Sequence, residues 1–425
     1  MPEKKLHIGI FGLGTVGTGV VELLMKGGGL RDDLNFVLEK VVVKNISKKR
    51  QISLPDGILS SHPEDILDNS EIDTVIEVIG GLHPAREFVL KALEEGKNVI
   101  TANKALLASS GSFIFQKAIE NNCYLGVRAS NIAAYRLIES LTTSPSRLKK
   151  LIGIFNGTCN YILTEMEKKG ENLKTVLKRA QSLGYAEANP ADDINGYDTA
   201  HKLIILLGLA LGYFPPPDSI YIEGIGNITC QDVLFARQLG YRIKLVAIAQ
   251  KENDLLEARV HPALLPVDRG LARLEGVENG LEIRDEIGLE IGMQAPGAGK
   301  YPTATAIIED LICIARGRKL FFSREASPLR LKPVGKIKTK YYLKFLALDK
   351  AGVLAKIAHV LGEHNISIES VIQKGREEKK EGVVPIIMLT HEAVEENIQE
   401  ALKKIKNLPV VKGDPLLIRV EEGIF

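Results

Sequence analysis

The sequence predicts an α/β protein in three parts: a parallel sheet with helices on both faces, an α/β region that follows it, and a C-terminal βαββαβ unit. Over the first 130 residues, short apolar segments alternate with helical ones, which is the pattern of a parallel sheet covered by helices. From about residue 135 to 305, apolar strands alternate with longer helices and turn-rich stretches. Beyond residue 340 the patterns run strand, helix, strand, strand, helix, strand, which is the ferredoxin-like order.

Length, charge and cysteine content exclude several classes of protein. A chain of 425 residues is longer than one small core usually holds, so we expect two or three domains. A net charge of +2 argues against a broad nucleic-acid-binding surface. The four cysteines are far apart and form no CxxC pair, which predicts reduced thiols, a cytoplasmic setting and no zinc site. The longest apolar run, 203–214, is shorter than the ~20 residues of a membrane span, and no secretory signal opens the chain.

The first region alternates regularly along the chain. The segment LHIGIFG is apolar and β-branched enough for a strand, and VGTGVVELLMKG after it has the spacing of a helix. The same alternation continues through PAREFVLKALEEG, a helical pattern between two apolar runs. The expected strands are 6–12, 40–45, 72–80 and 97–102, and the expected helices are 16–27 and 84–96.

The turn GLGTVG, between the first strand and the first helix, indicates a dinucleotide site. Gly12 permits a tight turn, Gly14 lets a pyrophosphate approach the backbone, and Gly17 lets the helix pack on the strand. Thr15 and Val16 begin the helix, whose free N–H groups and partial positive charge would face the anion. The alternative is a set of glycines that serve only the turn. The context predicts a Rossmann-like NAD(P)-binding domain.

The end of the second strand bears on the choice of nucleotide. An acidic residue there would bind the ribose hydroxyls of NAD, but the strand ends at Asn45, beside Lys44. Lys48, Lys49 and Arg50 follow closely. Ammonium and guanidinium groups suit a 2′-phosphate, so the stretch favours NADP over NAD, and NAD stays open. The alternative is a basic loop that only faces solvent.

A run of acids precedes a buried helix in the middle of the chain. The segment GYAEANPADDINGYDTAHKL holds Glu187, Asp192, Asp193, Asp198 and then Lys202, and an apolar helical stretch follows. Lys202 lies four residues after Asp198, so the two side chains share one helix face. The functional interpretation is a pocket with carboxylates for an ammonium group and a lysine for a reacting oxygen. The alternatives are an ion pair worth ~0.3–0.5 kcal/mol, a surface acid, and carboxylates that cap the helix.

Several stretches together resemble homoserine dehydrogenases, over nearly the whole chain. They are GLGTVG, EVIGG, GKNVITANKALLA, IFNGTCNYIL, GYAEANPADDINGYDTAHKL and APGAGKYPTA. The C-terminal unit, with LDKAGVLAKIAHVLGEHNISI, resembles an ACT domain. The resemblance implies reversible, NAD(P)H-dependent reduction of L-aspartate 4-semialdehyde to L-homoserine, in threonine, methionine and isoleucine biosynthesis. It also implies an amino-acid effector such as threonine at the ACT domain, and a homodimer or homotetramer.

With this resemblance, the patterns divide the chain into domains. We expect the NAD(P)-binding Rossmann-like domain over 1–132, completed by a helix at 303–318. A catalytic and dimerisation domain is expected over 133–302, a linker over 319–339 and the ACT domain over 340–425.

The resemblance also implies roles for particular residues. Lys104 and Lys202 match two active-site lysines, with Lys202 in the proton-donor position. Lys104 opens a helix directly after a strand, at the edge where parallel sheets bind ligands. Glu187 and Asp198 match carboxylates that hold the substrate's amino group, and Asp193 matches a further acidic position. The remaining matches are Gly157 and Thr158 beside the substrate, and Gly80, Lys104, Gly297 and Gly299 beside the cofactor.

Three positions depart from the resemblance. Arg128 stands where family members usually carry a glutamate, in a stretch that helps to bind a monovalent cation. A guanidinium cannot ligate sodium or potassium, so we predict that no metal binds. Arg128 would instead replace the cation's charge, or contact the substrate carboxylate or a nucleotide phosphate. Asn189 replaces a common aspartate and Ala351 a frequent proline.

These departures leave two other functions to consider. One is a non-catalytic sensor that binds a dinucleotide and an amino acid through separate domains. The other is a different NAD(P)-dependent amino-acid dehydrogenase on the same scaffold. A sensor has no need of a proton donor, so the retained lysines and carboxylates favour the enzyme.

Overall fold

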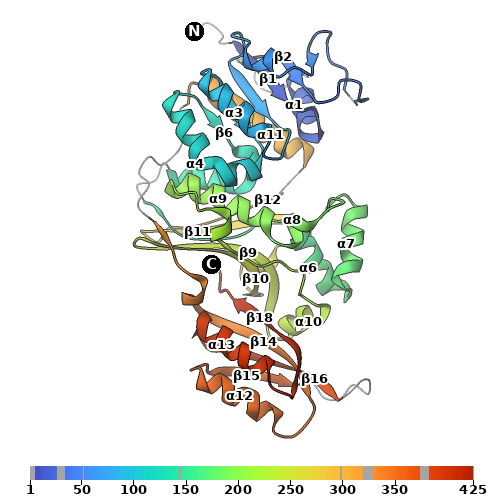
Figure 1. The fold of residues 1–425 in the computed structure, drawn as a ribbon, viewed down its shortest axis with the longest axis vertical. Helices are drawn as coiled ribbons and strands as arrows, with labels where there is room; N and C mark the ends of the chain where they lie inside the picture. The colour runs from blue at the N-terminus through green and yellow to red at the C-terminus, as the bar shows by residue number, and fades with distance from the viewer. Residues whose placement is uncertain are drawn as a thin grey trace. The chain divides into compact units, whose positions relative to one another are not determined.

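The structure is a computed structural model that describes residues 5–25, 34–50, 52–142, 146–296, 299–318, 329–373 and 382–424 (Figure 1). The chain divides into two compact units. The first contains Met1–Lys149, Asp198–Ile220 and Glu278–Leu329, and the second contains Lys150–Tyr197, Tyr221–Val277 and Arg330–Phe425. The first part of the expected linker, 319–328, and the charged segment KGREEKKE at 374–381 lie outside the described residues.

The first unit contains the parallel sheet that the sequence predicts. Its strands lie in the order β3-β2-β1-β4-β5-β6, and each neighbouring pair is parallel. This is the doubly wound order of dinucleotide-binding sheets. The strands are β1 (Lys5–Phe11), β2 (Asn35–Val42), β3 (Leu59–Ser60), β4 (Thr74–Glu77), β5 (Asn98–Thr101) and β6 (Leu125–Gly126).

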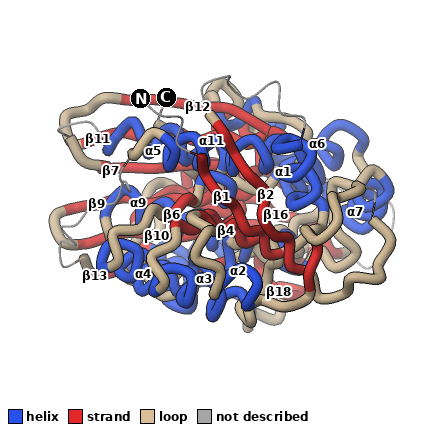
Figure 2. Tube along the Cα trace, turned by 90° about the horizontal axis from the view of Figure 1, so that it is seen from above, coloured by secondary structure: helices blue, strands red, loops and turns tan. Residues whose placement is uncertain are grey.

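Helices cover both faces of this sheet. Figure 2 shows α1 (Thr15–Met25) and α11 (Lys300–Ala315) on one side of β1 and β4, and α3 (Ala85–Glu94) and α4 (Lys104–Glu120) on the other. Fully buried side chains, including Ile8, Val20 and Ile307, join α1 and α11 to the sheet in one apolar core. The unit also contains α2 (Glu64–Leu67), η1 (Arg128–Ser130), α5 (Ile132–Thr142), most of α9 (Tyr197–Leu211), η2 (Pro217–Ser219), and the antiparallel pair β11 (Glu278–Asp285) and β12 (Glu290–Pro296).

The second unit is built on a run of strands in the order β7-β9-β10-β18-β14-β16-β15, with β8 and β13 beside β10 and β17 beside β14. The strands are β7 (Leu148–Ile154), β8 (Tyr221–Ile222), β9 (Tyr241–Glu252), β10 (Leu255–Pro266), β13 (Arg330–Leu331), β14 (Lys338–Leu348), β15 (Ile368–Gln373), β16 (Val383–Thr390), β17 (Ala393–Val394) and β18 (Val411–Val420). The helices are α6 (Gly157–Lys169), α7 (Leu173–Ser182), α8 (Ala191–Ile194), α10 (Cys230–Gln238), η3 (Leu271–Arg273), η4 (Val334–Lys336), α12 (Val353–Glu363) and α13 (Glu395–Lys406).

The C-terminal part of this unit has the predicted βαββαβ order: β14, α12, β15, β16, α13 and β18. Its helices are amphipathic. In α13 the buried residues Ile398, Ala401, Leu402 and Ile405 recur every three or four positions and pack on the sheet. Each buried leucine or isoleucine contributes about 1.5–3 kcal/mol.

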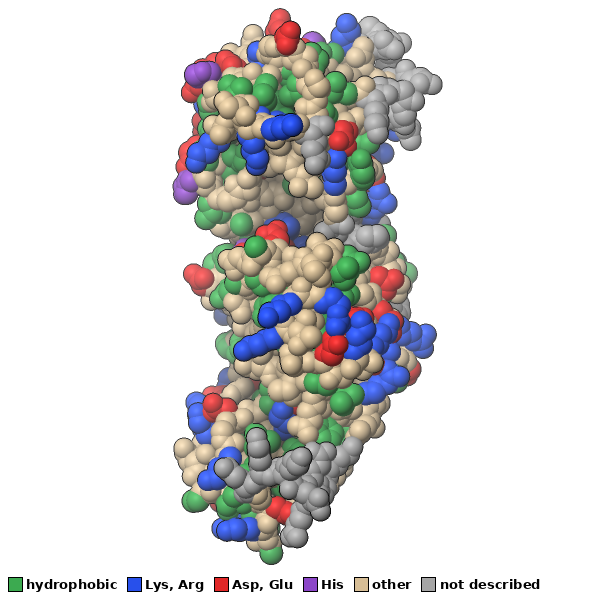
Figure 3. Space-filling view, turned by 90° about the vertical axis from the view of Figure 1, so that its right-hand side faces the viewer, with side chains coloured by type: hydrophobic (Ala, Val, Ile, Leu, Met, Phe, Trp, Pro, Cys, Tyr) green, Lys and Arg blue, Asp and Glu red, His purple; other side chains and the backbone are tan. Residues whose placement is uncertain are grey.

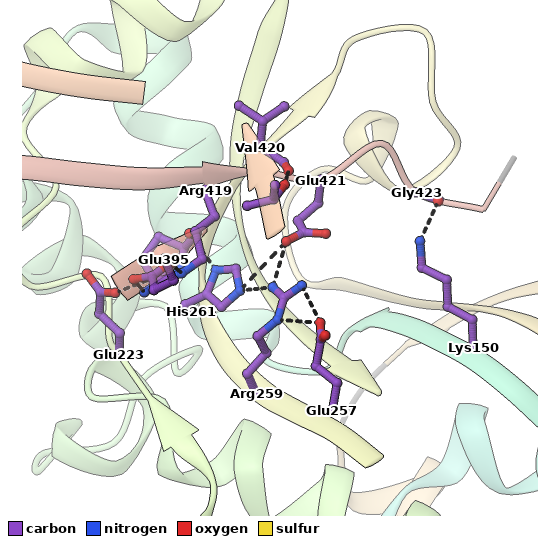
Figure 4. A network of polar contacts seen from close by, with 12 residues as sticks. Lys150, Glu223, Glu257, Arg259, His261, Glu395, Arg419, Val420, Glu421 and Gly423 are labelled. Atoms are coloured by element: carbon purple, nitrogen blue, oxygen red, sulfur yellow. Dashed lines mark hydrogen bonds and ion pairs between the residues drawn. The ribbon is translucent and has the colours of Figure 1, made fainter. Parts of the chain in front are cut away.

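One parallel contact joins the βαββαβ fold to β10, where Arg419 of β18 pairs with Ala263. Buried ion pairs surround this junction (Figure 4). The Arg419 guanidinium donates to both carboxylate oxygens of Glu395, at 2.9 and 2.6 Å. Arg259 of β10 donates to Glu421, just after β18, at 2.6 Å. The C-terminal fold is therefore held to β10 by backbone pairing and by buried charges together.

On the molecular face drawn in Figure 3, basic and acidic side chains lie interspersed, in keeping with the net charge of +2. Among the helices that the structure describes, none has both the length and the apolarity needed to cross a membrane.

Candidate active site

A cleft of about 600 Å³ lies at the carboxyl ends of β1, β2 and β4, in the first unit. Gly12 has φ +102°, and Gly17 lies so close to it that an added Cβ would be 2.3 Å from the Gly12 carbonyl oxygen. Glycine is therefore required at both positions. Gly14 lines the cleft at the start of α1, where helix N–H groups favour an anion. The lining residues are Gly12, Leu13, Gly14, Thr15, Thr18, Val43, Lys44, Asn45, Lys48, Lys49, Arg50, Val78, Ile79 and Lys300.

Basic residues form one wall of this cleft. Lys44, Lys48 and Lys49 are exposed. Arg50 is bound within its own loop, because NH1 and NH2 of its guanidinium donate to three backbone carbonyls of residues 45–48 at 2.5–2.9 Å. Arg50 thus holds the loop that carries the lysines, and the lysines present the positive charge.

The other residues predicted to contact the cofactor lie at or near the ends of strands and helices. Val16 is half-buried in the first turn of α1. Gly80 has φ +74°, and its N–H donates to the Glu77 carboxylate at 3.2 Å. Gly299 immediately precedes α11 with φ +137°. Gly297 lies outside the described residues.

The two lysines predicted to act in catalysis meet at one carboxylate, also in the first unit. Lys202 Nζ lies 2.6 Å from Asp198 Oδ2, and Lys104 Nζ lies 3.5 Å from Asp198 Oδ1. The Lys202 side chain is 9% exposed and that of Lys104 is 38% exposed. Lys202 lies near the start of α9, and the residues that follow it, 203–209, are all buried. Its ammonium group therefore lies where the polar first turn of this helix meets its apolar part. Asp198 can orient both ammonium groups.

In the second unit, the residues predicted to lie beside the substrate surround the start of α6. Asn156 caps this helix by accepting from Cys159 N, and its amide donates to Asp193 Oδ1 at 2.6 Å. The Thr158 hydroxyl donates to the backbone carbonyl of Tyr185 at 2.6 Å. A Cβ on Gly157 would be 2.8 Å from the Val277 carbonyl oxygen, so this turn needs glycine. Gly157 and Thr158 thus lie in the first turn of α6, and Asp193 of α8 accepts a hydrogen bond from the residue that caps this helix.

Three further polar residues of the motif are on the surface of the second unit. Glu187, Asn189 and Asp192 are exposed. The residue that precedes α8 is Pro190, which makes no side-chain capping bond. Asp192 and Asp193 lie inside the first turn of α8 instead, so the capping interpretation does not describe their position.

Arg128 is buried inside the first unit, with its side chain 6% exposed. Its NH1 contacts Asp310 and donates to the Tyr124 hydroxyl at 2.8 Å, and its NH2 contacts Glu139. The guanidinium carbon lies 4.6 Å from the centre of the Tyr135 ring. Burial raises the pKa of Asp310 to about 6, against the opposing pull of Arg128. Of the roles considered above, internal charge compensation fits this position best.

Sequence reasoning missed three residues near these sites: Asn103, Asn156 and Lys300. Asn103 and Asn156 each precede a helix that follows a strand and cap it with a side-chain oxygen. An asparagine at such a junction is a recognisable capping signal. Lys300 lines the cleft from the first turn of α11, and no local pattern links it to the glycine-rich turn.

Comparison with known protein families gives three matches. Residues 12–128 match the family described as homoserine dehydrogenase, NAD binding domain. Residues 135–312 match homoserine dehydrogenase, and residues 341–409 match the ACT domain.

Individual proteins match over nearly the full chain. A homoserine dehydrogenase of Pseudomonas aeruginosa is 39% identical, with 99% of each chain covered, and one of Bacillus subtilis is 34% identical, with 98% and 99% covered. The crystal structure of a homoserine dehydrogenase from Thiobacillus denitrificans has a TM-score of 0.91 at 38% identity, with 99% of each chain covered. A hyperthermophilic archaeal homoserine dehydrogenase in complex with NADPH has a TM-score of 0.62 at 24% identity, covering 75% of this chain and 100% of that one, which shows a shared fold.

Proposed function

The chain belongs to the homoserine dehydrogenase family, and on that premise we propose that Lys202 donates the proton in reduction of L-aspartate 4-semialdehyde to L-homoserine. The observation that carries the proposal is the pair of lysines on one carboxylate, with Lys202 2.6 Å and Lys104 3.5 Å from Asp198. Catalysis by an ammonium group needs orientation and limited access to water. Lys202 has both, because its side chain is 9% exposed and bonded to Asp198.

Reduction of an aldehyde places negative charge on the carbonyl oxygen. NAD(P)H, when bound, supplies the hydride to the carbonyl carbon. The Lys202 ammonium group stabilises the developing alkoxide and then protonates it, and Asp198 holds that ammonium group in position. Lys104 adds a second positive charge at the same carboxylate. Removal of such a group typically lowers the rate by about 10²–10⁴-fold.

The substrate's own charges indicate the other partners. Its α-ammonium group needs carboxylates, for which we assign Glu187 and Asp198, and we assign Asp193 to substrate binding as a further acidic residue of the same motif. The turn of Gly157 and Thr158 would lie beside the carbon chain. The hydrogen bond from Asn156 to Asp193 supports this role, since it holds the carboxylate in one orientation.

Replacement of the ammonium group tests the assignment. Lys202→Met keeps an unbranched, largely apolar side chain and removes the proton donor. We expect kcat with aspartate 4-semialdehyde to fall by about 10²–10⁴-fold while the Kd for NADPH stays within about twofold. Lys174→Met, at an exposed lysine of α7, is the matched control and should behave as wild type. An equal loss of NADPH affinity and of kcat in Lys202→Met would contradict a role in the chemical step.

For the cofactor we propose NADP, with NAD as the alternative. The cleft fits a dinucleotide, because a Cβ at Gly14 would meet no atom of the described residues within 4 Å, which leaves room for a pyrophosphate. The exposed Lys44, Lys48 and Lys49 lie on the wall where a 2′-phosphate would sit, and Asn45 adds no negative charge to repel it. A structure of the same fold has been solved with NADPH.

The nucleotide preference can be measured within one protein. Lys48→Gln combined with Lys49→Gln should raise the Kd for NADPH about tenfold or more and leave that for NADH within about twofold, because only NADPH carries the extra phosphate. A parallel loss of affinity for both nucleotides would contradict the assignment.

The assembly and regulation belong to the same proposal. We assign a homodimer or homotetramer, an amino-acid effector such as threonine at the C-terminal ACT fold, and a cytoplasmic location. Light scattering of the purified protein tests the assembly. Titration with threonine during turnover tests the effector, and unchanged rates at millimolar threonine would reject it.

A further inference from the structure

A hydrogen-bonded cluster of Glu77, Thr101 and Asn103 lies where β4 and β5 end. Glu77 is fully buried. One of its carboxylate oxygens accepts from the N–H groups of Ile79 and Gly80, at 2.9 and 3.2 Å, and the other accepts from the Thr101 hydroxyl at 2.6 Å. Glu77 and Thr101 are neighbours in the sheet register. The carboxylate therefore fixes the loop after β4 by its backbone.

Asn103 connects that loop to the helix that carries Lys104. Its backbone N–H donates to Thr101 Oγ1 at 3.0 Å, and its side-chain amide donates to the carbonyl of Gly81 at 2.6 Å. Its side-chain oxygen accepts from Leu106 N at 3.1 Å and caps α4. Lys104 is the next residue, the first of α4. One side chain thus bonds to two segments that follow different strands.

Both segments border a site described above. Val78 and Ile79 line the dinucleotide cleft, and Gly80 and Gly81 both have positive φ, at +74° and +73°. From the other segment Lys104 reaches Asp198, at 3.5 Å. A displacement of Asn103 would therefore move both the cleft wall and the lysine.

We propose that Asn103 is a positioning residue that sets the cofactor loop Val78–Gly81 and Lys104 in one fixed arrangement. The inference rests on the proposed role of Lys104 in catalysis. Asn103 is 6% exposed, whereas Gly81 is exposed, so loss of the amide donor would leave the Gly81 carbonyl to water and would release its loop from the start of α4. Loss of one such hydrogen bond weakens the dependent arrangement by a factor of about 3–10.

The substitution Asn103→Asp separates the two bonds of the side chain. Aspartate caps a helix as well as asparagine, so the bond to Leu106 N persists. Aspartate has no amide donor, so a carboxylate oxygen would face the Gly81 carbonyl oxygen and could not form this hydrogen bond. Asn172→Asp is the matched control, because Asn172 caps α7 through Oδ1 in the same manner, at 3.0 Å from Thr175 N, and is exposed. Thermal unfolding of both variants reports on the cap.

The decisive measurement is a cycle with Lys104→Met, using kcat and the Kd for NADPH. Asn103→Asp should lower kcat about 3–10-fold in the wild-type background and by less than about twofold when Lys104 is absent. The Kd for NADPH should rise in both backgrounds, because the loop Val78–Gly81 is released in both. If Asn103→Asp does not yield folded protein, Asn103→Ser takes its place, since serine also caps but does not reach Gly81.

Two results would overturn the inference. One is a kcat and Kd within about twofold of wild type in Asn103→Asp. The other is an equal fall of kcat in both backgrounds, which indicates a general structural effect. The wild-type rate and the Lys202→Met variant are measured alongside. If those behave as proposed while Asn103→Asp does not, the proposed function stands and the positioning role alone is rejected.

Discussion

Acidification should destabilise this protein through one histidine, His261 of β10. The ring is fully buried, and its Nδ1 lies 2.9 Å from the Pro262 carbonyl oxygen. A carbonyl only accepts, so Nδ1 carries the proton. Nε2 faces the guanidinium of Arg259 (Figure 4), which only donates, so Nε2 offers its lone pair. The folded arrangement therefore requires a neutral ring.

The size of the effect follows from this requirement. Burial, and then the charges of Arg259 and Arg419, lower the pKa of His261 well below its ordinary value of 6.5. The carboxylate of Glu421 lies 4.0 Å from Nε2 and would favour a proton, but that carboxylate is already paired with Arg259. Because the folded pKa is depressed, this contribution to stability is complete above the unfolded pKa and is lost as the pH falls below it. The loss is about 1.4 kcal/mol at pH 5.5 and about 2 kcal/mol at pH 5.

Urea unfolding of wild type and His261→Gln at about pH 7.5 and pH 5 tests the prediction. Glutamine keeps an acceptor for Arg259 and does not titrate. The variant is expected to be less stable at the higher pH, but its loss between the two pH values should be smaller than that of wild type by about 2 kcal/mol. The other histidines contribute equally to both proteins and cancel. Equal losses in the two proteins would refute the argument, because His261 would then bind its proton equally well in both states.

Arg128→Met should destabilise the first unit by about 3–5 kcal/mol, because it leaves the buried Asp310 carboxylate without its guanidinium. Removing the positive charge raises the folded pKa of Asp310 further above its unfolded value, so the penalty should grow as the pH rises from about 6, the folded pKa in wild type, toward the higher folded pKa of the variant, and a loss independent of pH would contradict this. Gly14→Ala should lower NADPH affinity at an unchanged melting temperature, since an added Cβ meets no protein atom of the described residues within 4 Å. Gly17→Ala should lower both the NADPH affinity and the melting temperature, since its Cβ would lie 2.3 Å from the Gly12 carbonyl oxygen. Equal melting temperatures for the two glycine variants would refute the distinction.

Much of the fold could be predicted because its signals are local. The apolar periodicity of α13 and the apolar runs of β14 and β16 predict the C-terminal βαββαβ order from neighbouring residues alone. The glycine-rich turn could be placed between β1 and α1 for the same reason, since backbone conformation at Gly12 depends on adjacent residues. Helix boundaries were less accurate. The helix expected at 303–318 spans Lys300–Ala315, because its start depends on the turn before it.

The candidate site was predictable in part. Asp198 and Lys202 are four residues apart on one helix, so their contact follows from helix geometry. The contact of Lys104 with Asp198 joins separate parts of the chain, and only the packing of α4 and α9 establishes it. The hydrogen bonds of Arg50 could not be predicted. Its guanidinium lines the cleft and also donates to backbone carbonyls of its own loop, a conformation that no linear pattern indicates.

The sequence by itself determined which segments become strands and helices, where the glycine-rich turn lies, and which charged residues share a helix face. These features depend on interactions within a few residues, which a linear pattern records. Only the tertiary structure decided that Asp310 accepts from Arg128, 182 residues earlier, that β18 pairs with β10, and that Asn103 holds the Gly81 carbonyl. Such contacts form between segments brought together by strand pairing and core packing, and burial then makes each unpaired polar group costly.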